Sequence, residues 1–250
     1  MKLAVKPKLM KILVAAAGIL GLALRTVLYT AGVDRKGLLI SGHWSGIGVW
    51  LLTAGVTLIL LLWCRQLTGV QAQSESFPAA LSSAAGAALA GIALVLCPVL
   101  QAPSPTFAMI EPLLRYTAAV SLIYISYCRF RGKTPLFLLH CCVCLYLALR
   151  LICQYRVWSA DPQIQNYAFY LGAHVALMLT AYQFAAFDAG FGNCRTLWGA
   201  GLAAIYLSIV SLTGSEEPFF LICCTLWIFS SLNLPSANPP KNQPTQEELP

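Results

Sequence analysis

The chain has 250 residues, of which 58% are hydrophobic and only 10% are charged, with a net charge of +7. Soluble domains carry about a quarter charged residues, so this composition excludes an ordinary soluble protein and indicates a membrane protein. Because backbone groups in lipid must be satisfied internally, we expect an all-α bundle of transmembrane helices in contact with the lipid bilayer. The positive charge fits cytoplasmic anchoring of these helices, and we expect no nucleic acid partner.

The first two predicted spans are marked by their flanking residues. An apolar run at 12–31 follows four lysines and lacks a clear cleavage site, which favours an uncleaved span over a signal peptide. The second span, 44–63, has a tryptophan at each end, as is typical of the membrane interface.

The third predicted span, 79–100, is rich in Ala, Gly and Ser. Ser83, Ala87 and Gly91 are spaced four apart, which lets helix backbones approach closely. We therefore expect this helix to be the central, most enclosed one. The alternative is that its small residues line a cavity.

Proline preceded by a polar residue marks the helix starts in the second half of the chain. These signals divide it into spans at about 112–127, 135–154, 166–187, 196–213 and 218–234. The total is about eight helices in one domain, 1–234, or seven if the short last segment does not span. Residues 235–250 are Pro- and Asn-rich and are predicted to form a disordered cytoplasmic tail.

Counting Lys and Arg on alternate sides predicts the orientation. With the N-terminus inside, the far side holds only Arg35, Lys36 and Arg156, and the inner side holds the larger set of Lys2, Lys6, Lys8, Lys11, Arg65, Arg129, Arg131, Lys133, Arg195 and Lys241. The positive-inside rule then places both termini in the cytoplasm of a multi-pass cell membrane protein.

Three arginines remain inside predicted spans: Arg25, Arg115 and Arg150. The predicted topology brings them all to the outer third of the bilayer, near Glu111 and His43. Intramembrane charges usually face a bundle interior, so we predict an outward-facing basic pocket for a carboxylate or phosphate. Two alternatives are that the arginines snorkel to the interface, and that Glu111 and Arg115 form a local i,i+4 pair.

The ten cysteines lie in or beside apolar runs, as small buried residues do. The run His140-Cys141-Cys142-Val143-Cys144 allows a thiol redox pair of Cys141 and Cys144. It also allows half of a metal site, completed by His174 or by Cys223 and Cys224. Apolar surroundings and the incomplete ligand set favour simple packing, so we predict neither a metal nor a cofactor.

Two further polar residues lie in the sixth predicted span. His174 is either a proton carrier or a hydrogen-bonding bridge between helices. Asp188 ends that span and is expected to pair with Arg195 across the following turn.

No phosphate-binding loop, nucleophile elbow, zinc-protease motif or dinucleotide motif occurs in the sequence. We expect a protein that binds, and transports, a small anionic solute or lipid head group. Arg115 and Arg150 would hold the anion, and Arg25 would add positive potential. Glu111 and His43 complete the predicted binding residues, and no residue is assigned a catalytic role. The alternatives are a membrane-embedded enzyme for lipid or thiol substrates, and a subunit that packs against another membrane protein.

Overall fold

The computed structural model describes residues 7–34, 39–40, 42–67, 81–100, 109–159, 167–215 and 217–232, without the side chains of residues 97–100 and 157–158. These ranges contain eight α-helices, which confirms the predicted all-α bundle. The helices are α1 (Pro7–Ala31), α2 (Trp44–Gln66), α3 (Leu81–Leu100), α4 (Ile110–Phe130), α5 (Phe137–Trp158), α6 (Ala168–Asp188), α7 (Cys194–Ser211) and α8 (Pro218–Ser231). The predicted tail, 235–250, lies outside the described residues.

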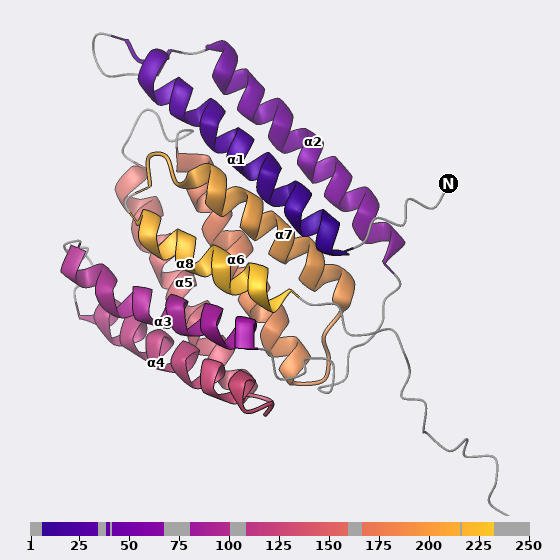
Figure 1. Cartoon of the computed structure of the whole chain (residues 1–250). Coiled ribbons are helices and arrows are strands. Elements are labelled where there is room, and N and C mark those ends of the chain that lie inside the picture. Colours follow the sequence, from indigo (N-terminus) through magenta and orange to yellow (C-terminus); the bar gives the residue numbers. More distant parts are fainter. Residues whose placement is uncertain are drawn as a thin grey trace, which may run out of the picture.

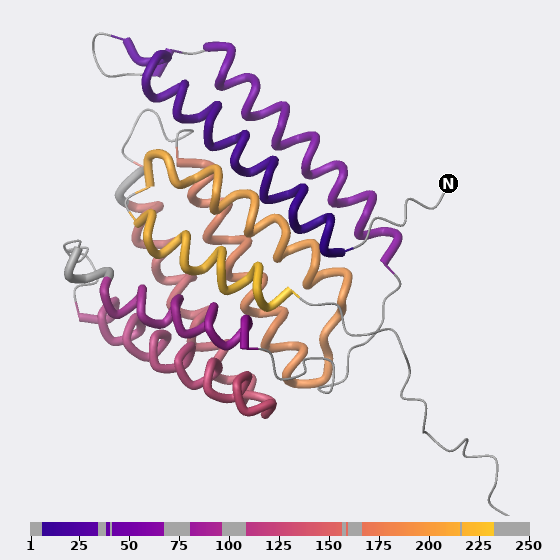
Figure 2. Tube along the Cα trace, viewed as in Figure 1, coloured from indigo at the N-terminus to yellow at the C-terminus, as the bar shows by residue number. Residues whose placement is uncertain are grey.

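Six of these helices form a closed ring. Each helix from α3 to α7 packs against the next one along the chain, and α8 packs against both α7 and α3. The first two helices form an antiparallel pair outside the ring, against α7 (Figures 1 and 2). The central helix is therefore α7, and the prediction that the third segment would be the most enclosed is wrong. Leu81, Leu89 and Ile92 of α3 are exposed on its outer face.

Close packing of the small residues in α3 is confirmed, however. A Cβ atom on Gly86 would lie 2.8 Å from the Cα atom of Trp227 in α8, and one on Gly91 would lie 3.0 Å from the Ala119 carbonyl oxygen in α4. Such distances leave no room for a side chain, so these glycines let α8 and α4 approach α3 closely.

The helices alternate in direction, so the bundle has two defined ends. At the terminal end, where α1 begins and α8 finishes, Ser83 contacts Ser231 at 2.8 Å, and Lys11 Nζ donates to the Leu232 carbonyl at 2.9 Å. At the far end, Glu111 in the first turn of α4 meets Arg150 in α5. The start of α1 and the finish of α8 therefore lie at the same end of the bundle.

Among the described residues, α1, α2, α5, α6 and α7 are long and apolar enough to cross a membrane. These five helices fit a membrane protein. The final helix has 14 residues, which is about 21 Å at 1.5 Å per residue and less than the roughly 30 Å of a bilayer core. It is thus shorter than the predicted 218–234 segment. It begins at Pro218 with Glu217 as its N-cap, as the proline signal predicted.

Candidate functional site

Four charged side chains from three helices form a buried network at the far end. Glu111 Oε1 accepts from Arg115 Nη2 at 2.6 Å and from Arg150 Nη1 at 2.8 Å. Arg150 also donates through Nη2 to Glu217 Oε1. We call Glu111, Arg115, Arg150 and Glu217 the far-end cluster. Each of the four residues is at most 6% exposed, so the charges lie inside the bundle and not at its surface.

Local sequence explains how these side chains meet. Glu111 and Arg115 are one helical turn apart on α4, so the predicted i,i+4 pair is confirmed. Arg150 belongs to the buried face of α5, together with Tyr146 one turn before it. Glu217 occupies the N-cap position of α8 without a side-chain hydrogen bond to the helix, and the helix dipole there favours a carboxylate.

Several polar atoms beside this network have no hydrogen-bond partner in the part of the chain that the structure describes. They are the two guanidinium Nε atoms of Arg115 and Arg150, Oε2 of Glu111, and both amide atoms of Gln154. Gln154 is one turn beyond Arg150 on the same helix and is 5% exposed. A buried donor or acceptor without a partner costs about 1–3 kcal/mol, so these atoms mark a place where a water molecule or a ligand would be stabilised.

Arg25 reaches a different part of the far end. Its Nη1 donates to the Val210 carbonyl in the last turn of α7 at 3.2 Å, and its Nη2 donates to the Tyr29 hydroxyl at 3.4 Å. The guanidinium also lies over the ring of Phe169, 5.2 Å from its centre. A cation at a helix C-terminus interacts favourably with the helix dipole, so Arg25 stabilises the contact between α1 and α7.

His43 and His174 are also at the far end, in separate surroundings. His43 Nδ1 lies 2.7 Å from Ser45 Oγ, at the corner between α1 and α2. His174 is 1% exposed within the ring, with Nδ1 3.1 Å from the Tyr170 carbonyl oxygen. The predicted site residues are thus divided: Glu111, Arg115 and Arg150 are in direct contact, whereas the contacts of Arg25 and His43 are with α1, α2, α6 and α7.

A second charged group lies at the terminal end. Arg129 Nη2 is 2.7 Å from Asp188 Oδ1, and His140 Nε2 is 2.9 Å from Asp188 Oδ2. These contacts join the end of α4, the start of α5 and the end of α6. The partners of Asp188 are therefore Arg129 and His140, and the expected pairing with Arg195 is wrong. Arg195 instead donates its backbone N–H to the side chain of Asn193, the N-cap of α7.

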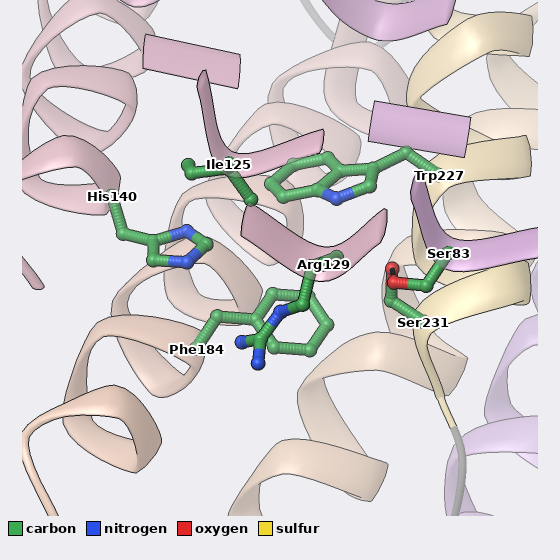
Figure 3. A pocket seen from close by; sticks show the side chains of 7 residues that line it. All are labelled: Ser83, Ile125, Arg129, His140, Phe184, Trp227 and Ser231. Carbon is green, nitrogen blue, oxygen red and sulfur yellow. Dashed lines mark hydrogen bonds between the residues drawn. The ribbon is translucent and has the colours of Figure 1, made fainter. Parts of the chain in front are cut away.

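Next to this group is a small hollow, lined by side chains from five helices. Its walls are formed by Ser83, Ile125, Arg129, His140, Phe184, Trp227 and Ser231 (Figure 3). We call it the terminal-end hollow. It has room for about one water molecule.

The cysteines near His140 are free thiols in the structure. Each of the nine described cysteines is a free thiol, and Cys141 is exposed whereas Cys144 is partly buried. Cys144 Sγ lies 3.6 Å from the Met178 carbonyl oxygen. No group of three or more potential metal ligands occurs among the described residues.

Sequence reasoning missed Glu217 as a partner of Arg150 and missed the Arg129–Asp188–His140 contacts. A signal was present, because alternating helices bring every second helix end to the same end of the bundle. That signal places Arg129 and Asp188 at the same end of the bundle, but it does not say which helices are neighbours there.

Comparisons of the chain with protein-family models, with curated proteins and with solved structures found no match. The two charged groups are therefore the features of this molecule from which a function can be inferred.

Proposed function

We propose that this is a multi-pass membrane protein whose far end binds a small monoanionic group, such as a carboxylate or a phosphate ester of a lipid head group, as a step in its transport. The far-end cluster forms the site, with Gln154 and His174 beside it. The observation that carries the proposal is the set of buried guanidinium and amide donors of Arg115, Arg150 and Gln154, which find no acceptor among the described residues.

The chemistry of these donors suits an anion. Arg115 and Arg150 each use terminal guanidinium nitrogens on carboxylates and keep an Nε–H for another acceptor. A guanidinium presents its donors in a fixed planar fork that matches carboxylate and phosphate oxygens. The amide group of Gln154 adds a donor for a neutral oxygen of the same ligand.

The charge balance favours one negative charge on the ligand. The far-end cluster carries two positive charges, on Arg115 and Arg150, and two negative charges, on Glu111 and Glu217. A monoanion therefore adds one negative charge to a neutral group, whereas a dianion adds two. Uncompensated charge inside a membrane is costly, so a monoanion is held there more readily than a dianion.

Orientation and proton coupling complete the proposal. The excess of Lys and Arg at the terminal end supports cytoplasmic termini in a cell membrane, with the far end facing outward. His174 is the proposed proton carrier. Its Nδ1 lies against a carbonyl oxygen and must donate a hydrogen there, which leaves the lone pair of Nε2 to accept a proton.

The test is thermal unfolding of the detergent-purified protein with acetate, lactate or dimethyl phosphate, each of which is a monoanion near neutral pH, whereas a phosphate monoester is mainly a dianion. A ligand at 100 times its Kd stabilises the folded state by about 2.7 kcal/mol, and the effect saturates. We expect Arg150→Gln to abolish this stabilisation. The exposed Arg65→Gln at the terminal end is the matched control and should leave it unchanged.

A second variant separates binding from folding. Glu217→Gln keeps both arginines and removes one competing carboxylate, so it should bind the monoanion at least about tenfold more tightly, equivalent to 1.4 kcal/mol. If no anion stabilises the wild-type protein, or if Glu217→Gln leaves the affinity unchanged, the cluster is an internal ion-pair network and the proposed function is wrong.

A further inference from the structure

We propose that His140 and Asp188 form a proton-binding site at the terminal-end hollow. This inference is independent of the proposed anion site, because none of its residues belongs to the far-end cluster. The site would exchange protons with the side of the membrane that the terminal end faces.

The geometry identifies the atom that takes the proton. His140 Nε2 is 2.9 Å from a carboxylate oxygen of Asp188, without hydrogen-bond alignment but close enough that the negative charge favours the tautomer with hydrogen on Nε2. In that tautomer Nδ1 carries the lone pair, and Nδ1 has no hydrogen-bond partner within the described ranges. His140 is 1% exposed and lines the hollow, so its imidazole is a buried base beside a space for one water molecule (Figure 3).

Asp188 lowers the cost of the positive charge that protonation would create. Its Oδ1 binds Arg129 at 2.7 Å and its Oδ2 faces His140, so the two cationic partners use different oxygens. The three groups carry no net charge when the imidazole is neutral and one positive charge when it is protonated. One proton enters or leaves, and no covalent bond between heavy atoms changes.

The charged groups around His140 come from two helices. Those that act on it electrostatically are Asp188 from α6 and Arg129 from α4. The walls from α3 and α8 contribute the hydroxyls of Ser83 and Ser231 and the ring of Trp227, which is stacked parallel to the imidazole at an interplanar angle of 10°.

Water can link this base to solvent. The hydroxyls of Ser83, in the first turn of α3, and Ser231, in the last turn of α8, lie 2.8 Å apart. They provide donors and acceptors for a water molecule in the hollow. The aromatic rings of Phe184 and Trp227 keep the remaining walls apolar. A proton would therefore pass through water to Nδ1, and the apolar walls would restrict other solutes.

The experiment is an NMR titration of the full chain in detergent micelles, with all histidines labelled with 13C. The chain has three histidines, so His140→Gln assigns the signal by its loss. In the wild-type protein we expect the His140 signal to move between two positions as the pH is varied from about 4 to 9, the range in which histidine side chains titrate in proteins. Asp188→Asn should displace this transition by about one pH unit or more, because the compensating charge is lost. The exposed Asp34→Asn is the matched control and should leave the transition in place.

Two outcomes would overturn the proposal. In the wild-type protein, a His140 signal that stays fixed over the whole pH range would show that no proton binds, and this arm does not depend on the folding of any variant. A transition that Asp188→Asn leaves unchanged would show that the base acts without the carboxylate. Conversely, if the anion test fails but this titration succeeds, the proton site stands without the proposed function.

Discussion

Neutralising Glu111 is the most informative perturbation of the far-end cluster. One oxygen of this side chain accepts from two arginines, at 2.6 and 2.8 Å, and the residue is fully buried. In Glu111→Gln the shape is kept, but Arg115 loses its carboxylate partner and Arg150 keeps only Glu217.

The size of the effect follows from these contacts. Removing one partner of a buried ion pair costs about 3–5 kcal/mol, because a charge stays buried without compensation. For a chain of this length, 1 kcal/mol corresponds to about 2–4 °C in Tm, so Glu111→Gln should lower Tm by about 6–20 °C. Glu217→Gln should cost less than half as much, since Arg150 keeps Glu111 and Arg115 is untouched.

The assay is thermal unfolding of the two variants and the wild-type protein in the same detergent, in a buffer free of carboxylates and phosphate. The order of the two effects tests the network itself. If Glu111→Gln is within about 2 °C of the wild-type protein, or is no less stable than Glu217→Gln, then Glu111 does not hold both arginines and the cluster is wrongly described.

Three further predictions concern packing, capping and orientation. Gly86→Ala should destabilise the fold by about 1–3 kcal/mol in thermal unfolding, because the new Cβ would meet the backbone of Trp227. Gly55→Ala is the control and should be neutral or stabilising, because a Cβ there has nothing within 4 Å. Equal effects of the two substitutions would contradict the close contact of α3 and α8. Lys11→Met should lower the free energy of unfolding by about 1–2 kcal/mol, since Lys11 Nζ donates to two carbonyls at the end of α8. The exposed Lys8→Met is its control, and equal losses of stability in the two variants would show that the cap is unimportant. A green fluorescent protein fused to the C-terminus should fluoresce and an alkaline phosphatase fusion should be inactive, because the positive-inside rule predicts a cytoplasmic C-terminus; the reverse result would invert the proposed topology.

The residues of the far-end cluster were predictable in part. The spacing of Glu111 and Arg115 within one helix was enough to predict their pair, since neighbours on a helix face meet whatever the tertiary structure. The contact between Arg150 and Glu217 was not predictable, because it depends on which helices are neighbours and on how each is rotated. Hydropathy determines the depth of a residue in the membrane but not the direction in which it faces.

The sequence by itself determined that this protein is a bundle of apolar helices, because composition and helix-start signals act locally along the chain. It also indicated that α3 packs closely, through the spacing of its small residues. Only the tertiary structure decided that α7, and not α3, is the enclosed helix, that Arg25 caps α7 instead of joining Arg115 and Arg150, and that Asp188 meets Arg129 and His140. These outcomes depend on the closure of the α3–α8 ring, and a closed ring is a property of all six helices together that no single segment encodes.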